Sequence, residues 1–187
     1  MNIYKTKIKD LLIIEHIKHL DSRGYFFELI GNEISSGLKK ITSKKINFVQ
    51  FNFSFSKKKN TLRGLHIQKK PFEQAKLVYC NKGKIVDFVV DVRKKSKTFG
   101  RYISFKLSGR DNKMIFIPSG FLHGFLTKTD NCEVIYGTSK FYSKKHEINI
   151  SFFDEYFNFK ELKKIRNFKI SSKDKKGHKL EKIENLI

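Results

Sequence analysis

Short runs of strand-forming residues separated by turn residues are the feature that most constrains how this chain folds. The clearest pair is Lys76–Cys80 and Lys84–Val92, because Asn81-Lys82-Gly83 between them is a typical hairpin turn. Similar runs recur as far as Tyr136, and no convincing amphipathic helix interrupts them before about residue 155. The spacing predicts an all-β fold, an antiparallel sandwich or barrel, with a short helix within residues 31–43 and a helical turn or two at residues 161–166.

Residues 46–56 alternate strictly between two kinds of side chain, as expected for a strand whose two faces differ. One face carries the polar residues Gln50, Asn52, Ser54 and Ser56. The other face carries Val49, Phe51, Phe53 and Phe55. Two interpretations remain open. In the first, this is an edge strand with its phenylalanines in the core and its polar groups in water. In the second, the polar face lines a ligand cavity in a barrel, and the phenylalanines pack against a second sheet or a partner subunit.

The length of 187 residues and the hydrophobic content of 39% are consistent with one domain that spans residues 1–187. The lysine-rich residues after about 155 are expected to form a peripheral extension. The formal net charge of +22 would attract polyanions of any kind. All but six of the 40 basic residues are lysines, however, and their doublets are spread along the whole chain. We therefore expect a solvated cationic surface and no binding of nucleic acid.

The two cysteines, Cys80 and Cys132, lie in apolar runs and lack the spacing of metal ligands. They are expected to be buried thiols, which fits a reducing, cytoplasmic setting. The apolar cluster Leu11–Ile14 is too short for a signal peptide. No stretch approaches the roughly 18 apolar residues that a membrane span requires, so association with a membrane is not expected.

The stretch Thr61–Gln68 combines a cation, a glycine and a titratable ring. Arg63 can bind an anion, and His66 can transfer a proton near neutral pH. Simple alternation places these two side chains on opposite faces of a strand. Both can serve one pocket only if the strand bulges between them, and Gly64 is the residue best suited to a bulge.

Several motifs along the chain occur together in the order and spacing of one known family. They are Asp21–Glu28, Gln50–Asn52, Leu62–Gln68, Gln74–Val78, Gly83–Asp87, Val90–Ser96, Ile117–Phe125 and Tyr136. In this combination the chain resembles the dTDP-4-dehydrorhamnose 3,5-epimerases, which are cupin-type enzymes of deoxysugar biosynthesis. The resemblance covers about residues 10–150 and implies a jelly-roll β-barrel. It ends at Phe153–Tyr156, which replaces the family's usual Asp-Pro followed by a tryptophan.

The resemblance implies inversion at C3 and C5 of a nucleotide-linked 4-keto-6-deoxy sugar. Protons next to a ketone can be removed only if the developing enolate is stabilised, so the site needs a base, a cation and an acid on the opposite ring face. By similarity, His66 is the base and Asp174 orients it. Lys76 stabilises the enolate at the C4 oxygen, and Tyr136 returns a proton from the other side.

Substrate-binding residues also follow from the resemblance. Arg63 would contact the diphosphate. The residues expected around the sugar and phosphates are Gln50, Asn52, His123, Glu147 and Lys173. The resemblance further implies a homodimer, in which a neighbouring subunit's site is completed by Arg23, Phe26 and Glu28.

No metal and no cofactor are expected. Metal-binding cupins carry two histidines one residue apart, whereas Gln68 stands at the second of these positions. Proton removal and return at a ketone cause no net redox change, and no glycine-rich phosphate loop is present. Two alternatives stay open. One is an epimerase that inverts only C3 or only C5, or that acts on another nucleotide 4-keto sugar. The other is a non-catalytic cupin that binds sugar nucleotides or nucleic acid.

Overall fold

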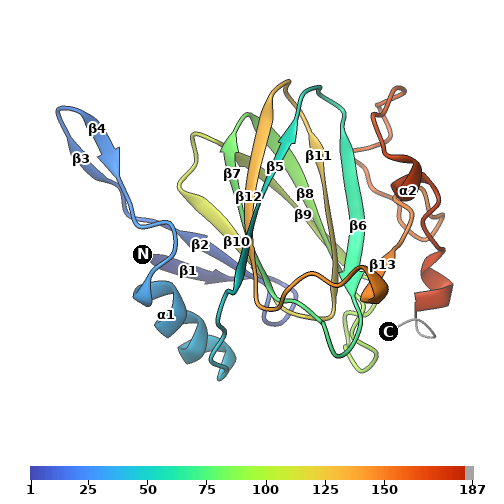
Figure 1. Ribbon diagram of the computed structural model, residues 1–187, viewed down its shortest axis with the longest axis horizontal. Helices are drawn as coiled ribbons and strands as arrows, with labels where there is room; N and C mark the ends of the chain where they lie inside the picture. Colours follow the sequence, from blue (N-terminus) through green and yellow to red (C-terminus); the bar gives the residue numbers. More distant parts are fainter. Residues whose placement is uncertain (184–187) are drawn as a thin grey trace.

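Two antiparallel sheets face each other in the computed structural model, which describes residues 1–183 (Figure 1). The six-stranded sheet consists, in spatial order, of β1 (Asn2–Lys5), β2 (Leu12–Glu15), β10 (Lys113–Ile117), β7 (Lys76–Lys82), β12 (Cys132–Thr138) and β5 (Gln50–Ser56). The five-stranded sheet consists of β13 (Glu147–Asn149), β6 (Leu62–Gln68), β11 (Phe121–Thr127), β8 (Lys84–Asp91) and β9 (Tyr102–Ser108). The predicted all-β, antiparallel fold of the jelly-roll or cupin class is confirmed.

A separate hairpin projects from the barrel near the N-terminus (Figure 1). It is formed by β3 (His19–Asp21) and β4 (Gly24–Phe26), which make their own two-stranded sheet. The helix predicted within residues 31–43 is present as α1 (Asn32–Thr42). None of the helices within residues 1–183 is long and apolar enough to cross a membrane.

Apolar side chains form three layers. The middle layer lies between the sheets, where Val78 and Val134 of the six-stranded sheet meet Val89 and Phe125 of the five-stranded one. Both cysteines belong to this layer and are free thiols, as predicted. The second layer lies on the outer face of the six-stranded sheet. There α1 buries Ile34 and Leu38 against Leu77 and Phe116, which protects that face from water.

The third layer corrects the expectation of a peripheral C-terminal extension. Phe157 and Phe159 are buried against Phe88 on the outer face of the five-stranded sheet, and the ring centroids of Phe88 and Phe159 are 4.8 Å apart. An apolar sheet face must be covered, and here irregular chain covers it. Where a helical turn or two was expected at residues 161–166, residues 161–164 form turns and residues 165–166 are irregular. The C-terminal segment instead contains the short helix α2 (Ser172–Lys175) and a 3-10 turn (Leu180–Lys182). The last four residues of the expected extension, 184–187, lie outside the described part of the chain.

The bulge predicted at Gly64 is confirmed by the pairing of β6 with β11. His66 pairs with His123, and Arg63 pairs with Phe125. Between these two pairs, β6 therefore contains one more residue than β11. Gly64 supplies the conformation, with a φ of +106° that residues with a side chain rarely adopt. As a result, Arg63 and His66 line the same cavity.

We expect Gly64→Ala to lower the free energy of unfolding by about 3 kcal/mol, as backbone strain combines with a steric clash. A Cβ atom at this position would lie 2.7 Å from the backbone oxygen of His123 and 2.8 Å from Cα of Gly124. The matched control is Gly24→Ala, where φ is +137° but no heavy atom lies within 4 Å. Urea denaturation should show a clearly larger loss for Gly64→Ala, and equal losses would contradict the described packing.

Candidate active site

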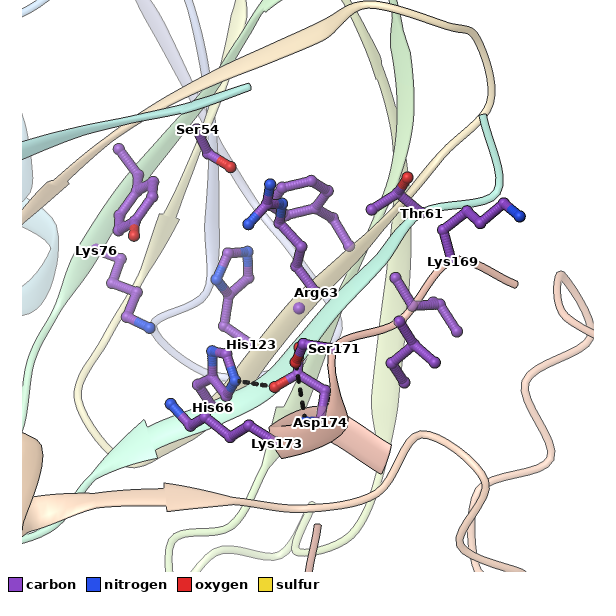
Figure 2. Close-up of a pocket in the computed structure, with 15 residues that line it drawn as sticks. Ser54, Thr61, Arg63, His66, Lys76, His123, Lys169, Ser171, Lys173 and Asp174 are labelled. Atoms are coloured by element: carbon purple, nitrogen blue, oxygen red, sulfur yellow. Dashed lines mark hydrogen bonds and ion pairs between the residues drawn. The ribbon is translucent and has the colours of Figure 1, made fainter. Parts of the chain in front are cut away.

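A cavity of about 500 Å³ lies between the two sheets (Figure 2). Strands β5, β7 and β12 form its wall on one side, and β6 and β11 form it on the other. Residues of the segment 169–174, which leads into α2, also line it. The four residues predicted to be catalytic all line this cavity. They are His66, Lys76, Tyr136 and Asp174.

His66 and Asp174 form a hydrogen-bonded pair although they are 108 residues apart in the chain. His66 Nε2 lies 2.8 Å from Asp174 Oδ1, and Gly64 N donates to Asp174 Oδ2 at 3.3 Å. Helix α2 presents the carboxylate, and Ser171 caps its first turn by accepting from Asp174 N. Burial alone would raise the pKa of Asp174, but the hydrogen bonds from His66 and Gly64 bring it below its ordinary value. An ionised Asp174 places the imidazole proton on Nε2, which leaves Nδ1 free to accept another proton.

Lys76 and Tyr136 come from neighbouring strands. Lys76 pairs with Thr138, two residues from Tyr136, so both side chains project from the same face of the sheet. Burial lowers the pKa of Lys76 to about 8, with Glu147 and Asp87 limiting the fall. Burial also raises the pKa of Tyr136, and the nearby guanidinium of Arg63 offsets part of that rise. Near pH 7 the cavity therefore contains an ammonium group and a protonated phenol.

These groups give the cavity three complementary chemical abilities. His66 can accept a proton, Tyr136 can donate one, and the ammonium of Lys76 can stabilise a negative oxygen. Figure 2 shows His66, His123 and Lys76 projecting into the same space from separate strands. Such an arrangement suits the removal and return of a proton at carbon next to a carbonyl group.

Three of the predicted binding residues also line the cavity, namely Arg63, His123 and Lys173. Arg63 is fixed in place because Nε donates to Ser56 Oγ at 3.1 Å and Nη2 donates to the backbone oxygen of Phe55 at 2.8 Å. His123 is buried, and its Nε2 lies 2.7 Å from Asp87 Oδ2. Two cationic side chains and an imidazole at one cavity make it suitable for an anionic ligand such as a diphosphate.

The orientation of β5 resolves the choice left open by its alternating sequence. Phe51, Phe53 and Phe55 are 52%, 61% and 47% exposed, whereas Ser54 of the polar face lines the cavity. The polar face is therefore turned toward the cavity, as the second interpretation predicts, and Ser54 of that face lines it. Packing of the phenylalanines against a partner subunit stays a prediction. Asn52 stands directly opposite Tyr136 in the pairing of β5 with β12.

The remaining predicted binding residues lie outside the cavity lining. Gln50 donates to Asn52 Oδ1 at 2.7 Å and accepts from the backbone nitrogen of Tyr142 at 2.9 Å. Glu147 lies beside His66, with Oε1 3.8 Å from Nδ1 of that ring. Gln50, Asn52 and Glu147 are not part of the cavity lining.

The hairpin residues occupy a different part of the molecule. Arg23 is exposed and pairs with Asp21, while Phe26 and Glu28 line a second cavity beside α1. Figure 1 shows the hairpin directed away from the barrel. Arg23, Phe26 and Glu28 therefore do not contribute to the cavity of their own chain, and their role in a neighbouring subunit stays a prediction.

Four more polar residues line the cavity, namely Ser54, Thr61, Lys169 and Ser171. Ser54 belongs to the polar face that the sequence pattern of residues 46–56 indicated. Ser54 follows Gln50 and Asn52 on that face of β5. Its hydroxyl is buried and makes no hydrogen bond to any described residue. No sequence pattern indicated Lys169. It reaches the cavity because backbone hydrogen bonds join its irregular segment to the start of β6.

Gln68, which replaces a histidine of metal-binding cupins, has a structural role. Its side chain donates to the backbone oxygen of Phe72 at 2.8 Å and accepts from Ser143 N at 2.6 Å. Within residues 1–183, no group of three or more His, Cys, Asp and Glu side chains is arranged to hold a metal ion.

Fold and site together define a cupin-type acid–base enzyme, in which a jelly-roll barrel encloses an imidazole–carboxylate pair, a phenol and an ammonium group. Residues 5–182 match the family model described as dTDP-4-dehydrorhamnose 3,5-epimerase. The chain belongs to this family of isomerases.

Named relatives agree with the family match. The dTDP-4-dehydrorhamnose 3,5-epimerase of Shigella flexneri is 40% identical over 187 residues, which is 100% of both chains. The crystal structure of the enzyme of that name from Elizabethkingia anophelis is 34% identical, with a TM-score of 0.88 and coverage of 97% of each chain. A dTDP-6-deoxy-D-glucose-3,5-epimerase from Legionella pneumophila, solved in complex with dTDP-4-keto-L-rhamnose, is 32% identical. It has a TM-score of 0.89 and coverage of 100% of this chain and 96% of that one.

Proposed function

We propose that this protein, acting as a single catalytic domain, converts dTDP-4-dehydro-6-deoxyglucose to dTDP-4-dehydrorhamnose by inverting C3 and C5. The observation that carries the proposal is the shared cavity of His66, Lys76 and Tyr136, with Asp174 hydrogen-bonded to the imidazole. Family membership and the complex of the Legionella pneumophila relative with dTDP-4-keto-L-rhamnose support the choice of substrate.

The proposed cycle begins when Nδ1 of His66 removes the proton from C3 or C5, both of which adjoin the C4 ketone. The electron pair moves into the ring, and the C4 oxygen becomes an enolate that the ammonium of Lys76 stabilises. Tyr136 then donates its proton to the same carbon from the opposite face, which inverts the centre. One proton leaves the sugar and one returns, so no redox partner is needed. Each inversion leaves an imidazolium at His66 and a phenolate at Tyr136, and exchange with solvent restores both groups before the next centre reacts. Arg63 and Lys173 would hold the diphosphate.

The proposed assembly is a homodimer in which each hairpin completes the partner's site. Exposed apolar side chains support it, since Leu20 and Phe26 on the hairpin are 79% and 69% exposed. The aromatic face of β5, the edge strand of its sheet, offers a matching apolar surface. Light scattering should give twice the mass of the chain. Mixing inactive Arg23→Ala with inactive His66→Ala should restore part of the activity, because one site of the mixed dimer regains both residues.

The function is tested by incubating the protein with dTDP-4-dehydro-6-deoxyglucose in deuterium oxide and following C3 and C5 by NMR. We expect deuterium at both positions together with the inverted product. Exchange and inversion at only one position would identify a C3-only or C5-only epimerase. Absence of exchange with this substrate and with other nucleotide 4-keto sugars would overturn the enzymatic proposal in favour of a binding protein.

We expect kcat/KM to fall above pH 8, about tenfold for each further unit, because the required ammonium form of Lys76 is lost as pH rises through its pKa of about 8. The measurement is a pH profile of kcat/KM. Lys76→Arg keeps a cation at every accessible pH, so its lower activity should show no such fall near pH 8. A fall at the same pH in both proteins would assign it to another group.

A further inference from the structure

His66 lies between two carboxylates, although the proposed cycle uses only one of them. Asp174 faces Nε2, and Glu147 faces the opposite nitrogen, with its Oε1 3.8 Å from Nδ1. Strand pairing fixes this placement. His66 pairs with Asn149 of β13, and Glu147 stands two residues before Asn149, on the same face of the strand.

The two oxygens of Glu147 have different surroundings. Oε2 accepts hydrogen bonds from the ammonium of Lys173 and from the hydroxyl of Tyr142, the latter at 2.8 Å. Oε1 is the oxygen that faces His66. The side chain is only 11% exposed, so water screens its charge weakly. Burial alone would raise the pKa of Glu147, but Lys173, Tyr142 and His66 bring it below its ordinary value, and the group stays ionised.

We infer that Glu147 is a positioning residue for the base. Its charge stabilises the proton that His66 Nδ1 takes from the sugar, and Lys173 limits how strongly it does so. This inference rests on the proposed function and assigns Glu147 a role other than contact with the substrate. Once Nδ1 is protonated, the imidazolium has a carboxylate on each side, which favours the charged state that proton removal creates. The ammonium of Lys173 opposes this effect, because it neutralises part of the charge of Glu147.

The other charged or titratable groups that line the cavity with His66 come from five strands and helices and one irregular segment. Tyr136 lies on β12, and Lys169 lies in the irregular segment before α2. Asp174 lies on α2, His123 lies on the paired strand β11, Lys76 lies on β7, and Arg63 lies on β6 itself. Substitution of Glu147 or Lys173 leaves all of these groups in place. Differences in pH dependence between the variants can therefore be assigned to the network of Glu147. Loss of a diphosphate contact in Lys173→Met would instead lower kcat/KM equally at every pH.

Two substitutions should move the acid limb of the kcat/KM profile in opposite directions, and a third should leave it in place. Glu147→Gln removes the negative charge but keeps a similar shape, so the acid limb of the kcat/KM profile should move about one pH unit lower. Lys173→Met removes the opposing cation, so that limb should move several tenths of a unit higher. Tyr142→Phe breaks a hydrogen bond in the same network without changing its charge, so the limb should stay within about 0.2 units.

The same comparison can be made without substrate. The imidazole C–H signals of His66, assigned by their loss in His66→Asn, should show titration midpoints that shift in the same directions. Opposite shifts for Glu147→Gln and Lys173→Met support the inference even if the wild-type protein fails to turn over the proposed substrate. Shifts of one sign in all three variants would overturn the inference, because they would indicate loss of local structure. No shift in any variant would also overturn it, because the charge of Glu147 would then not act on His66.

Discussion

His66→Ala should lower kcat by about 10³-fold or more and abolish deuterium incorporation at both C3 and C5. Both proton removals use the same imidazole in the proposed cycle, so neither position has a substitute base. Lys76, another amine on the cavity wall, carries a proton at neutral pH, because its pKa of about 8 keeps most of it in the ammonium form. The measurement is exchange at each carbon by NMR in deuterium oxide, together with the rate of product formation.

Two further variants separate loss of the base from loss of structure. Asp174→Asn should reduce kcat by about 10²- to 10⁴-fold, because an amide no longer fixes the proton on Nε2. His178→Ala removes an exposed imidazole in the C-terminal segment and should leave the rate unchanged. Normal exchange in a folded His66→Ala protein would rule out His66 as the base and require another group on the cavity wall.

Much of the fold and part of the site could be predicted from local sequence pattern. The alternating residues of β5 predicted two possible orientations of the strand. The exposure of Phe53 shows that the aromatic face points outward. The need for Arg63 and His66 to share one pocket required a bulge, and Gly64 was the one residue between them free to adopt a positive φ. These predictions succeed because successive side chains of a strand point to opposite faces and because glycine readily adopts positive φ angles.

Features that depend on irregular chain could not be predicted in this way. Residues Phe157 and Phe159 cover a sheet face without any periodic pattern, so their burial leaves no signal in the sequence. Lys169 reaches the cavity by a backbone pairing with Thr61 that no side-chain pattern encodes. The placement of Asp174 was reached only through family resemblance. Contacts of this kind arise from the path of the whole chain, which local propensity does not determine.

Tyr136→Phe should separate proton removal from inversion. The substitution removes one oxygen and keeps the ring, which packs against the core between the sheets. His66 can still remove a proton, and the enolate can regain a deuteron from the same face after the imidazole exchanges with solvent. We expect exchange within about tenfold of the wild-type rate, while inversion falls by more than about 10²-fold. The substrate should therefore accumulate deuterium with its configuration retained.

This outcome depends on the protonation state of Tyr136. If the phenol had already lost its proton, it could not act as the acid, and Tyr136→Phe would invert the sugar no more slowly than the wild-type protein. Burial raises the pKa of Tyr136, so the phenol keeps its proton at neutral pH and is available as the acid. Tyr79→Phe, which alters a buried tyrosine on the outer side of the same sheet, should keep both exchange and inversion. If Tyr136→Phe inverts the sugar at the normal rate, the proton on the second face must come from another donor. A structure of that variant with bound product should then show which of the remaining hydroxyl groups, beginning with the unpartnered one of Ser54, lies against the reacting carbon.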